Sequence, residues 1–230
     1  MQASTFTEHL DQKNRELIAA LEQSEYCRHF FSPARSTALI EALTGSLLHE
    51  AASYGCHLTI AISTALGRLA SHPQWLPWIR PLTESLLGEV SHPELARKDS
   101  AKLTHGAQDA ATTRPSPAAF AVAAIARFLC EQRHPLTHLG FFYLLEGTTS
   151  QIAPRLQEVL EARGIQSPFM KIHARDDAAH VEALRNAITK IVEKDSSIAA
   201  EIEYGYDCFA VAYPMLIWNT AANRALASQQ

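Results

Sequence analysis

Apolar residues recur along most of this chain at the three- and four-residue spacing that predicts amphipathic helices. In the first segment, Phe6, Leu10 and Leu17 share one stripe behind a capping-box sequence that starts at Thr5. No convincing stretch alternates apolar and polar residues as a half-buried β-strand would. The pattern therefore predicts an all-α fold, a bundle of seven to nine helices.

Prolines, glycines and polar runs divide the pattern into separate helical segments. Residues 93–116 and 164–171 lack apolar periodicity, so we expect both to be loops, and the longer one is the only good candidate for a linker. We therefore expect residues 1–230 to form a single helical domain. The expected helices start near residue 5, at 32–33 and near 57 (interrupted at Pro73 and Pro77), and then span 76–92, 117–132, 136–149, 152–163, 174–194 and 198–227.

Composition narrows the class of protein. The chain has 230 residues, 47% hydrophobic and 19% charged, which is typical of a globular protein and argues against disorder. The net charge of −4 argues against nucleic-acid binding through a broadly basic surface. No apolar run reaches the ~18 residues of a membrane span, and the N-terminal segment does not resemble a secretory signal. Four scattered cysteines without a CxxC pair predict reduced thiols in a cytoplasmic protein.

Three glutamates interrupt the apolar stripes. Glu50 follows Leu47 by three residues, Glu89 follows Leu86 by three residues, and Glu146 ends a run of apolar and aromatic residues. Burying an unpaired carboxylate costs several kcal/mol, unless it finds an arginine, takes up a proton or binds a cation. Glu50, Glu89 and Glu146 are therefore candidates for buried functional groups, such as metal ligands.

Histidines accompany the carboxylates at helical spacing. His92 lies one turn after Glu89, and His173, Asp177 and His180 fall on one face at spacings of four and three residues. The set is close to the di-iron carboxylate pattern, in which two helices each supply a Glu and two others each supply a Glu-x-x-His. Mixed carboxylate and imidazole donors suit iron or manganese, whereas structural zinc favours thiolates. We therefore predict a site for two iron ions, or for one iron and one manganese.

The spacing leaves the upstream carboxylates undecided. Glu84 lies on a more polar face than Glu89, beside Arg80, but it is an alternative to Glu89 on the same predicted helix. Glu50 is equally compatible with a place at the rim of the core. Glu50, Glu84 and Glu89 therefore remain in competition as metal ligands.

Three short segments carry a resemblance to a known family: residues 88–95 (GEVSHPEL), 140–150 (GFFYLLEGTTS) and 173–180 (HARDDAAH). In them the chain resembles the haem-oxygenase-like di-iron oxidases and oxygenases, also described as iron-containing redox enzymes. The resemblance implies a haem-oxygenase-like helical bundle with a non-haem di-iron or iron–manganese site that uses O2 to oxidise a small amine, amino acid or fatty acid. It assigns ligand roles to His92, Glu146, His173, Asp177 and His180.

Such chemistry requires a largely apolar, water-poor pocket. Aromatic residues are the candidates for its walls: Tyr143, Tyr206, Phe209 and Tyr213. The partners expected are O2 and a small molecule, with no nucleic acid and no membrane, and self-association into a homodimer stays open.

Three other functions compete with an oxidase. A true haem oxygenase would need a proximal histidine on the first helix, where His9 lies. A ferritin-like metal-binding protein uses a similar ligand pattern, but normally on four long helices. A metal-free, thiaminase-like helical enzyme is the third, and metal analysis of the purified protein would distinguish it; the shared face of His173, Asp177 and His180 has no explanation in a haem site.

Overall fold

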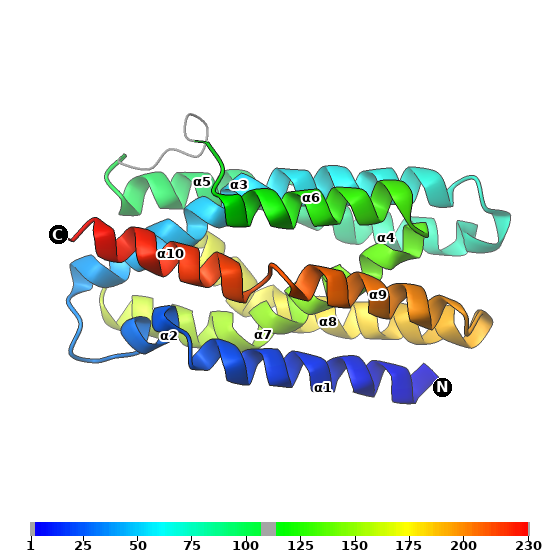
Figure 1. The fold of residues 1–230 in the computed structure, drawn as a ribbon, viewed down its shortest axis with the longest axis horizontal. Coiled ribbons are helices and arrows are strands. Elements are labelled where there is room, and N and C mark those ends of the chain that lie inside the picture. The colour runs from blue at the N-terminus through cyan, green and yellow to red at the C-terminus, as the bar shows by residue number, and fades with distance from the viewer. Residues whose placement is uncertain (1–2, 107–113, 230) are drawn as a thin grey trace.

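The computed structural model describes residues 3–106 and 114–229, and both ranges are helical, without a β-strand (Figure 1). The all-α prediction is confirmed. None of the described helices has the length and apolarity to cross a membrane. The α-helices are α1 (Ala3–Glu22), α2 (Glu25–Phe30), α3 (Thr37–Leu69), α4 (Leu76–Glu89), α5 (His92–Leu103), α6 (Pro117–Gln132), α7 (His138–Ala162), α8 (Pro168–Lys194), α9 (Ile198–Ala210) and α10 (Met215–Ala227), with short 3-10 helices η1 (Pro73–Trp75) and η2 (Pro135–Thr137).

The long helix α3 corrects the predicted break near residue 57. No proline interrupts it, and its buried stripe continues through Leu58, Ile62 and Leu66 at four-residue spacing. The half-buried His57 therefore lies within one continuous helix. This continuity gives the bundle an unbroken wall along much of its length.

Helix α5 replaces the first part of the loop that was expected over residues 93–116. Ahead of Leu103, its buried face carries His92, Ala96, Asp99 and Ser100, which are too small or too polar to register as an apolar pattern. The Ser100 hydroxyl donates to the carbonyl of Gly45 on α3 at 2.8 Å. Close helix contact thus drives this segment to fold, whereas residues 107–113 of the expected loop lie outside the described residues.

Several other predicted boundaries were wrong. Helix α7 runs through Pro154, although a break was expected after residue 149. Helix α8 begins at Pro168, because the Ser167 hydroxyl caps it by accepting from the Met170 N–H. The expected last helix is divided into α9 and α10 by a turn that contains Pro214, and the short α2 was not predicted.

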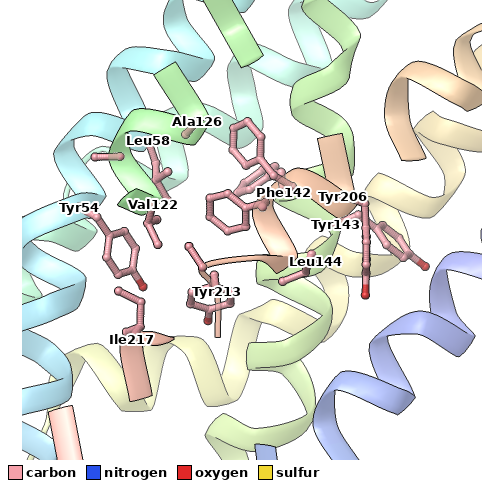
Figure 2. Close-up of a cluster of buried hydrophobic side chains, with 14 of the residues drawn as sticks. Tyr54, Leu58, Val122, Ala126, Phe142, Tyr143, Leu144, Tyr206, Tyr213 and Ile217 are labelled. Atoms are coloured by element: carbon pink, nitrogen blue, oxygen red, sulfur yellow. The ribbon is translucent and has the colours of Figure 1, made fainter. Parts of the chain in front are cut away.

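Helices α3 and α7 run antiparallel along the bundle (Figure 1). At one end, Arg68 of α3 donates to the carbonyls of Cys130 and Arg133, just before the start of α7. At the other end, Arg163 donates to the carbonyl of Arg35, which precedes α3. Between these ends the helices enclose an apolar core with α6, α9 and α10, and Figure 2 shows part of it.

Candidate metal centre

The short turn between α4 and α5 brings a carboxylate and an imidazole together. Glu89 is the last residue of α4 and His92 is the first of α5. The Glu89 Oε2 atom lies 2.6 Å from His92 Nδ1. In one continuous helix these side chains would lie one turn apart. The turn between α4 and α5 instead places both side chains on the inner side of the bundle.

Helices α7 and α8 supply the opposite side of the site. His180 Nδ1 lies 3.4 Å from Oε2 of Glu146 and 3.8 Å from Oε1 of Glu89. Two sets of potential ligand atoms result, each with its atoms within 4.8 Å of one another: Glu89, His92 and His173 in one, and Glu89, Glu146 and His180 in the other. Glu89 belongs to both sets, with Oε2 near His92 and Oε1 facing His180. We call these residues together with Asp177 the carboxylate–histidine centre.

His173 is oriented by its own helix. Its Nδ1 donates to the Phe169 carbonyl at 2.8 Å, which leaves the lone pair of Nε2 free to bind a metal. The ring packs against His92 with 4.7 Å between ring centroids. Burial lowers the pKa of His173 to about 4, so the ring is in the neutral form that a metal ligand requires.

Asp177 is the most deeply buried acid on α8. Its side chain is almost inaccessible, and Oδ2 has no hydrogen-bond partner. Burial, followed by the charge of Glu146, raises the pKa of Asp177 to about 8. Asp177 lies outside both sets of three, but it shares the electrostatic environment of Glu146.

The electrostatics of the centre fit a divalent cation. Burial raises the pKa of Glu146, and the hydrogen-bonding interaction with Glu146 raises the pKa of His180 to about 9. Buried atoms of Glu146, Asp177 and His92 lack a hydrogen-bond partner of good geometry. Buried polar atoms without partners are costly, and a cation in each ligand set would satisfy the atoms of His92 and Glu146. The donor set of carboxylates and imidazoles suits iron or manganese, and metal binding would displace the proton from His180.

Two of the competing carboxylates are engaged elsewhere. Glu50 is fully buried, but its Oε1 lies 2.6 Å from Nη2 of Arg224, and it accepts a hydrogen bond from Ser116. Glu84 is exposed and pairs with Arg80 at 2.9 Å. The structure therefore brings Glu89 into the centre and corrects the ligand hypotheses for Glu50 and Glu84, because their charges are met by arginine or by solvent.

An apolar cavity of about 100 Å³ adjoins the centre. Of the four aromatic residues predicted as its walls, Tyr213 lines it. Tyr143 and Tyr206 (Figure 2) direct their hydroxyls to Asp11 and Asn14 of α1 instead. Phe209 stacks on Phe141. The long side of the cavity is formed by α3, which the sequence did not indicate as a wall.

Asp99 was missed because it lies in a segment expected to be a loop. Its Oδ2 accepts hydrogen bonds from the Ser167 hydroxyl at 2.8 Å and from the Phe169 N–H at 2.9 Å. Asp99 on α5 therefore holds the start of α8, one turn before His173. Gly147, the residue after Glu146, allows Asn14 of α1 to pack closely, since the Asn14 amide nitrogen lies 2.0 Å from where a Cβ of Gly147 would be.

Comparison with known proteins identifies the family of this chain. A family model described as iron-containing redox enzyme matches residues 80–210, which is more than half of the chain. The chain belongs to this family. All residues of the carboxylate–histidine centre lie within the matched range.

Solved structures agree on the fold. A domain of unknown function with a haem oxygenase-like fold from Shewanella denitrificans is 18% identical, with a TM-score of 0.76 over 97% of this chain and 95% of that one. A CADD-like protein of unknown function from Nostoc punctiforme is 16% identical, with a TM-score of 0.64 over 99% and 97%. No curated protein matches the chain. These similarities identify a haem oxygenase-like fold.

Proposed function

We propose that this iron-containing redox enzyme is a non-haem, O2-dependent oxidase or oxygenase that holds two iron ions, or one iron and one manganese, in the carboxylate–histidine centre. The observation that carries the proposal is the pair of overlapping ligand sets that share Glu89. A carboxylate with two accessible oxygens between two groups of donors is suited to bridging two ions. The bound metals would supply the electrons and the binding site for O2.

The protein residues have separate tasks in this proposal. His92 and His173 would complete one metal site, and Glu146 and His180 the other, with Asp177 beside the second. Burial keeps His173 neutral, and its bond to the Phe169 carbonyl orients the ring. The raised pKa of Asp177 means that metal binding displaces a proton from it near neutral pH. The apolar cavity restricts water around the substrate.

The competing haem oxygenase function has less support. His9, the candidate for a proximal haem ligand, is 40% exposed in its side chain and lies 2.7 Å from Glu203 at the protein surface. A haem site would also give no role to the buried acids Glu146 and Asp177. Addition of haem should accordingly produce no saturable Soret shift.

Metal analysis and O2 uptake test the proposal together. Protein loaded anaerobically with Fe(II) should retain close to two metal ions per chain and consume O2 faster than the metal-free protein. Glu89→Ala should reduce occupancy of both sites, because Glu89 belongs to both ligand sets. Glu84→Ala is the matched control, since Glu84 lies on the same helix but is exposed and pairs with Arg80.

Two results would contradict the proposal. Wild-type protein that retains no iron or manganese after anaerobic loading excludes the metal centre. Equal O2 uptake with and without bound metal excludes metal-dependent oxidation, even if metal is retained.

A further inference from the structure

Helix α6 lies on the outside of the bundle beside α3 and exposes two aromatic rings (Figure 1). Phe120 is 69% exposed and Phe128 is 55% exposed. Ala124, also exposed, lies midway between them, so the three residues form one stripe at four-residue spacing on the outer face of α6. We call Phe120, Ala124 and Phe128 the α6 stripe. Large apolar side chains gathered on one exposed face indicate an interaction surface.

The α6 stripe has the same order of residue types when it is read from either end. Phe120 precedes Ala124 by four residues, and Phe128 follows it by four. A two-fold axis at Ala124 therefore pairs two antiparallel copies of α6, with Phe120 of each copy opposite the partner's Phe128. The small side chain on the axis lets the two helices approach closely. The stripe is thus complementary to a second copy of itself.

A groove beside Phe120 is placed to receive the partner's ring. The groove runs between α3 and α6, and its lining includes His57 of α3 together with Ala119 and Ala123 of α6. Phe120 itself forms part of the lining. In the two-fold arrangement the partner's Phe128 lies next to this groove. Because the arrangement is symmetric, both copies fill each other's groove at once.

The charges at the two ends of α6 are complementary in the same arrangement. Pro117 and Glu131 are each seven residues from Ala124, so the axis places Glu131 beside the start of the partner's helix. Exposed Arg114 precedes that start, where the helix dipole is also positive. Glu131 pairs with Arg127 at 2.6 Å, but its side chain stays 35% exposed. Opposite charges therefore meet at both ends of the paired helices.

We propose that α6 forms the interface of a symmetric homodimer, in which two antiparallel copies of the helix pack with the two-fold axis at Ala124. The four rings of Phe120 and Phe128 in the dimer bury roughly half of the ~1,000 Å² that a specific interface needs, and the groove walls between α3 and α6 supply the rest. None of the described residues that line the groove belongs to the carboxylate–histidine centre. The dimer is therefore independent of metal binding.

Charged side chains on the axis test this arrangement. Sedimentation velocity of the full-length protein, with and without Fe(II) under anaerobic conditions, should show a wild-type dimer at about 10–100 μM. Ala124→Glu and Ala124→Lys should each be monomeric, because two identical charges meet at the axis. An equimolar mixture of these two variants should form dimers again, since each mixed pair joins one negative and one positive side chain at the axis.

Removal of the rings tests the apolar part of the interface. Phe120→Ser and Phe128→Ser should each weaken dimerisation at least about tenfold, because each substitution removes two buried rings from the dimer. The matched controls are Leu87→Ser on α4 and Val211→Ser in the turn after α9, where the side chains are 66% and 79% exposed. These controls should leave the dimer Kd within about twofold of wild type. Far-UV circular dichroism checks that each variant is folded.

Each outcome decides for or against the proposal. Monomeric Ala124 variants that recombine into a mixed dimer support it. Wild-type protein that stays monomeric at the highest concentration overturns it and assigns the α6 stripe to a different partner. A dimer that both charged variants retain overturns it as well, because the chain then associates through another face. Folded, monomeric variants that do not recombine when mixed exclude a two-fold axis at Ala124.

Discussion

Asp177 is buried beside another acid, and both its burial and that neighbouring charge disfavour the ionised form of its carboxyl group. Its side chain is nearly inaccessible beside Glu146, and its pKa of about 8 lies far above the ordinary value of 3.8. Without metal, the folded protein holds a proton that the unfolded chain loses. Its free energy of unfolding therefore falls as pH rises from about 4 to about 8, and stays low above that range.

Asp177→Asn should stabilise the metal-free protein and impair metal binding. Above pH 8 the variant lacks the buried charge, so we expect it to be more stable than wild type by about 2 kcal/mol in urea unfolding. The advantage should shrink towards pH 4, and Fe(II) retention should fall. The control is Asp176→Asn, because Asp176 pairs with Arg175 at the surface. A pH-independent difference between Asp177→Asn and wild type would refute the electrostatic explanation.

Glu50 is a buried acid that, unlike Asp177, has an arginine partner. Its charge is met by Arg224 and the Ser116 hydroxyl, so we expect Glu50→Gln to destabilise the protein by about 2 kcal/mol, because the guanidinium loses its charged partner. Fe(II) retention per folded chain should equal that of wild type. Urea unfolding and metal analysis measure the two effects, and loss of metal from a folded variant would restore Glu50 as a candidate ligand.

At the scale of elements, the start of α8 links the metal centre to the rest of the bundle. Helix α8 contributes His173, Asp177 and His180, and without metal these side chains face Glu146 and Glu89. Burial of Asp177 beside Glu146 costs free energy, because the carboxyl must either take up a proton or carry a charge next to a like charge, and this lowers the local stability of the helix. The bonds from Asp99 to the start of α8 oppose this effect.

Hydrogen exchange should therefore respond to metal in this part of the chain. We expect slower amide exchange over residues 165–180 in Fe(II)-loaded protein than in metal-free protein, because the bound ions hold α8 against α4 and α7. The N-terminal half of α1 provides an internal reference that should not change. Equal protection of residues 165–180 in both forms would show that this segment is fully ordered without metal.

Asp99→Ala should weaken metal binding although Asp99 is not a ligand. It removes the acceptor for the Ser167 hydroxyl and the Phe169 N–H, so the helix start is held less firmly. We expect faster exchange near residues 167–173 and a several-fold loss of Fe(II) affinity. Addition of excess Fe(II) should restore occupancy. Unchanged Fe(II) affinity despite faster amide exchange would show that the start of α8 does not influence the metal site.

For the whole molecule, the centre joins four helices that are distant in sequence. Glu89, His92, Glu146 and His180 come from α4, α5, α7 and α8, respectively. A bound ion that none of these helices could hold alone stabilises the folded state relative to the unfolded chain.

Thermal unfolding should consequently depend on metal concentration. At 100 times the Kd, one site should stabilise the fold by about 2.7 kcal/mol, and Tm should rise further with added Fe(II) or Mn(II) under anaerobic conditions. A chelator should reverse the rise, and Glu89→Ala should show little of it. A Tm that does not change with metal would mean that the folded state does not bind the ions preferentially.

The sequence alone determined the helical character of the chain and the shared helix face of His173, Asp177 and His180. Both follow from local periodicity, which a helix converts directly into position. The same reasoning did not detect the small and polar buried face of α5, because Ala96 and Ser100 become core residues only in the folded protein, where the Ser100 hydroxyl bonds the Gly45 carbonyl of α3.

Only the tertiary structure decided which carboxylate joins the centre and where the cavity lies. Glu50, Glu84 and Glu89 are equivalent candidates in sequence, but Arg224 neutralises the first and solvent surrounds the second. The cavity wall on α3 likewise depends on which faces of α3 and α7 meet. Charge pairing and packing between distant segments are long-range interactions, and the spacing of residues within one helix does not contain them.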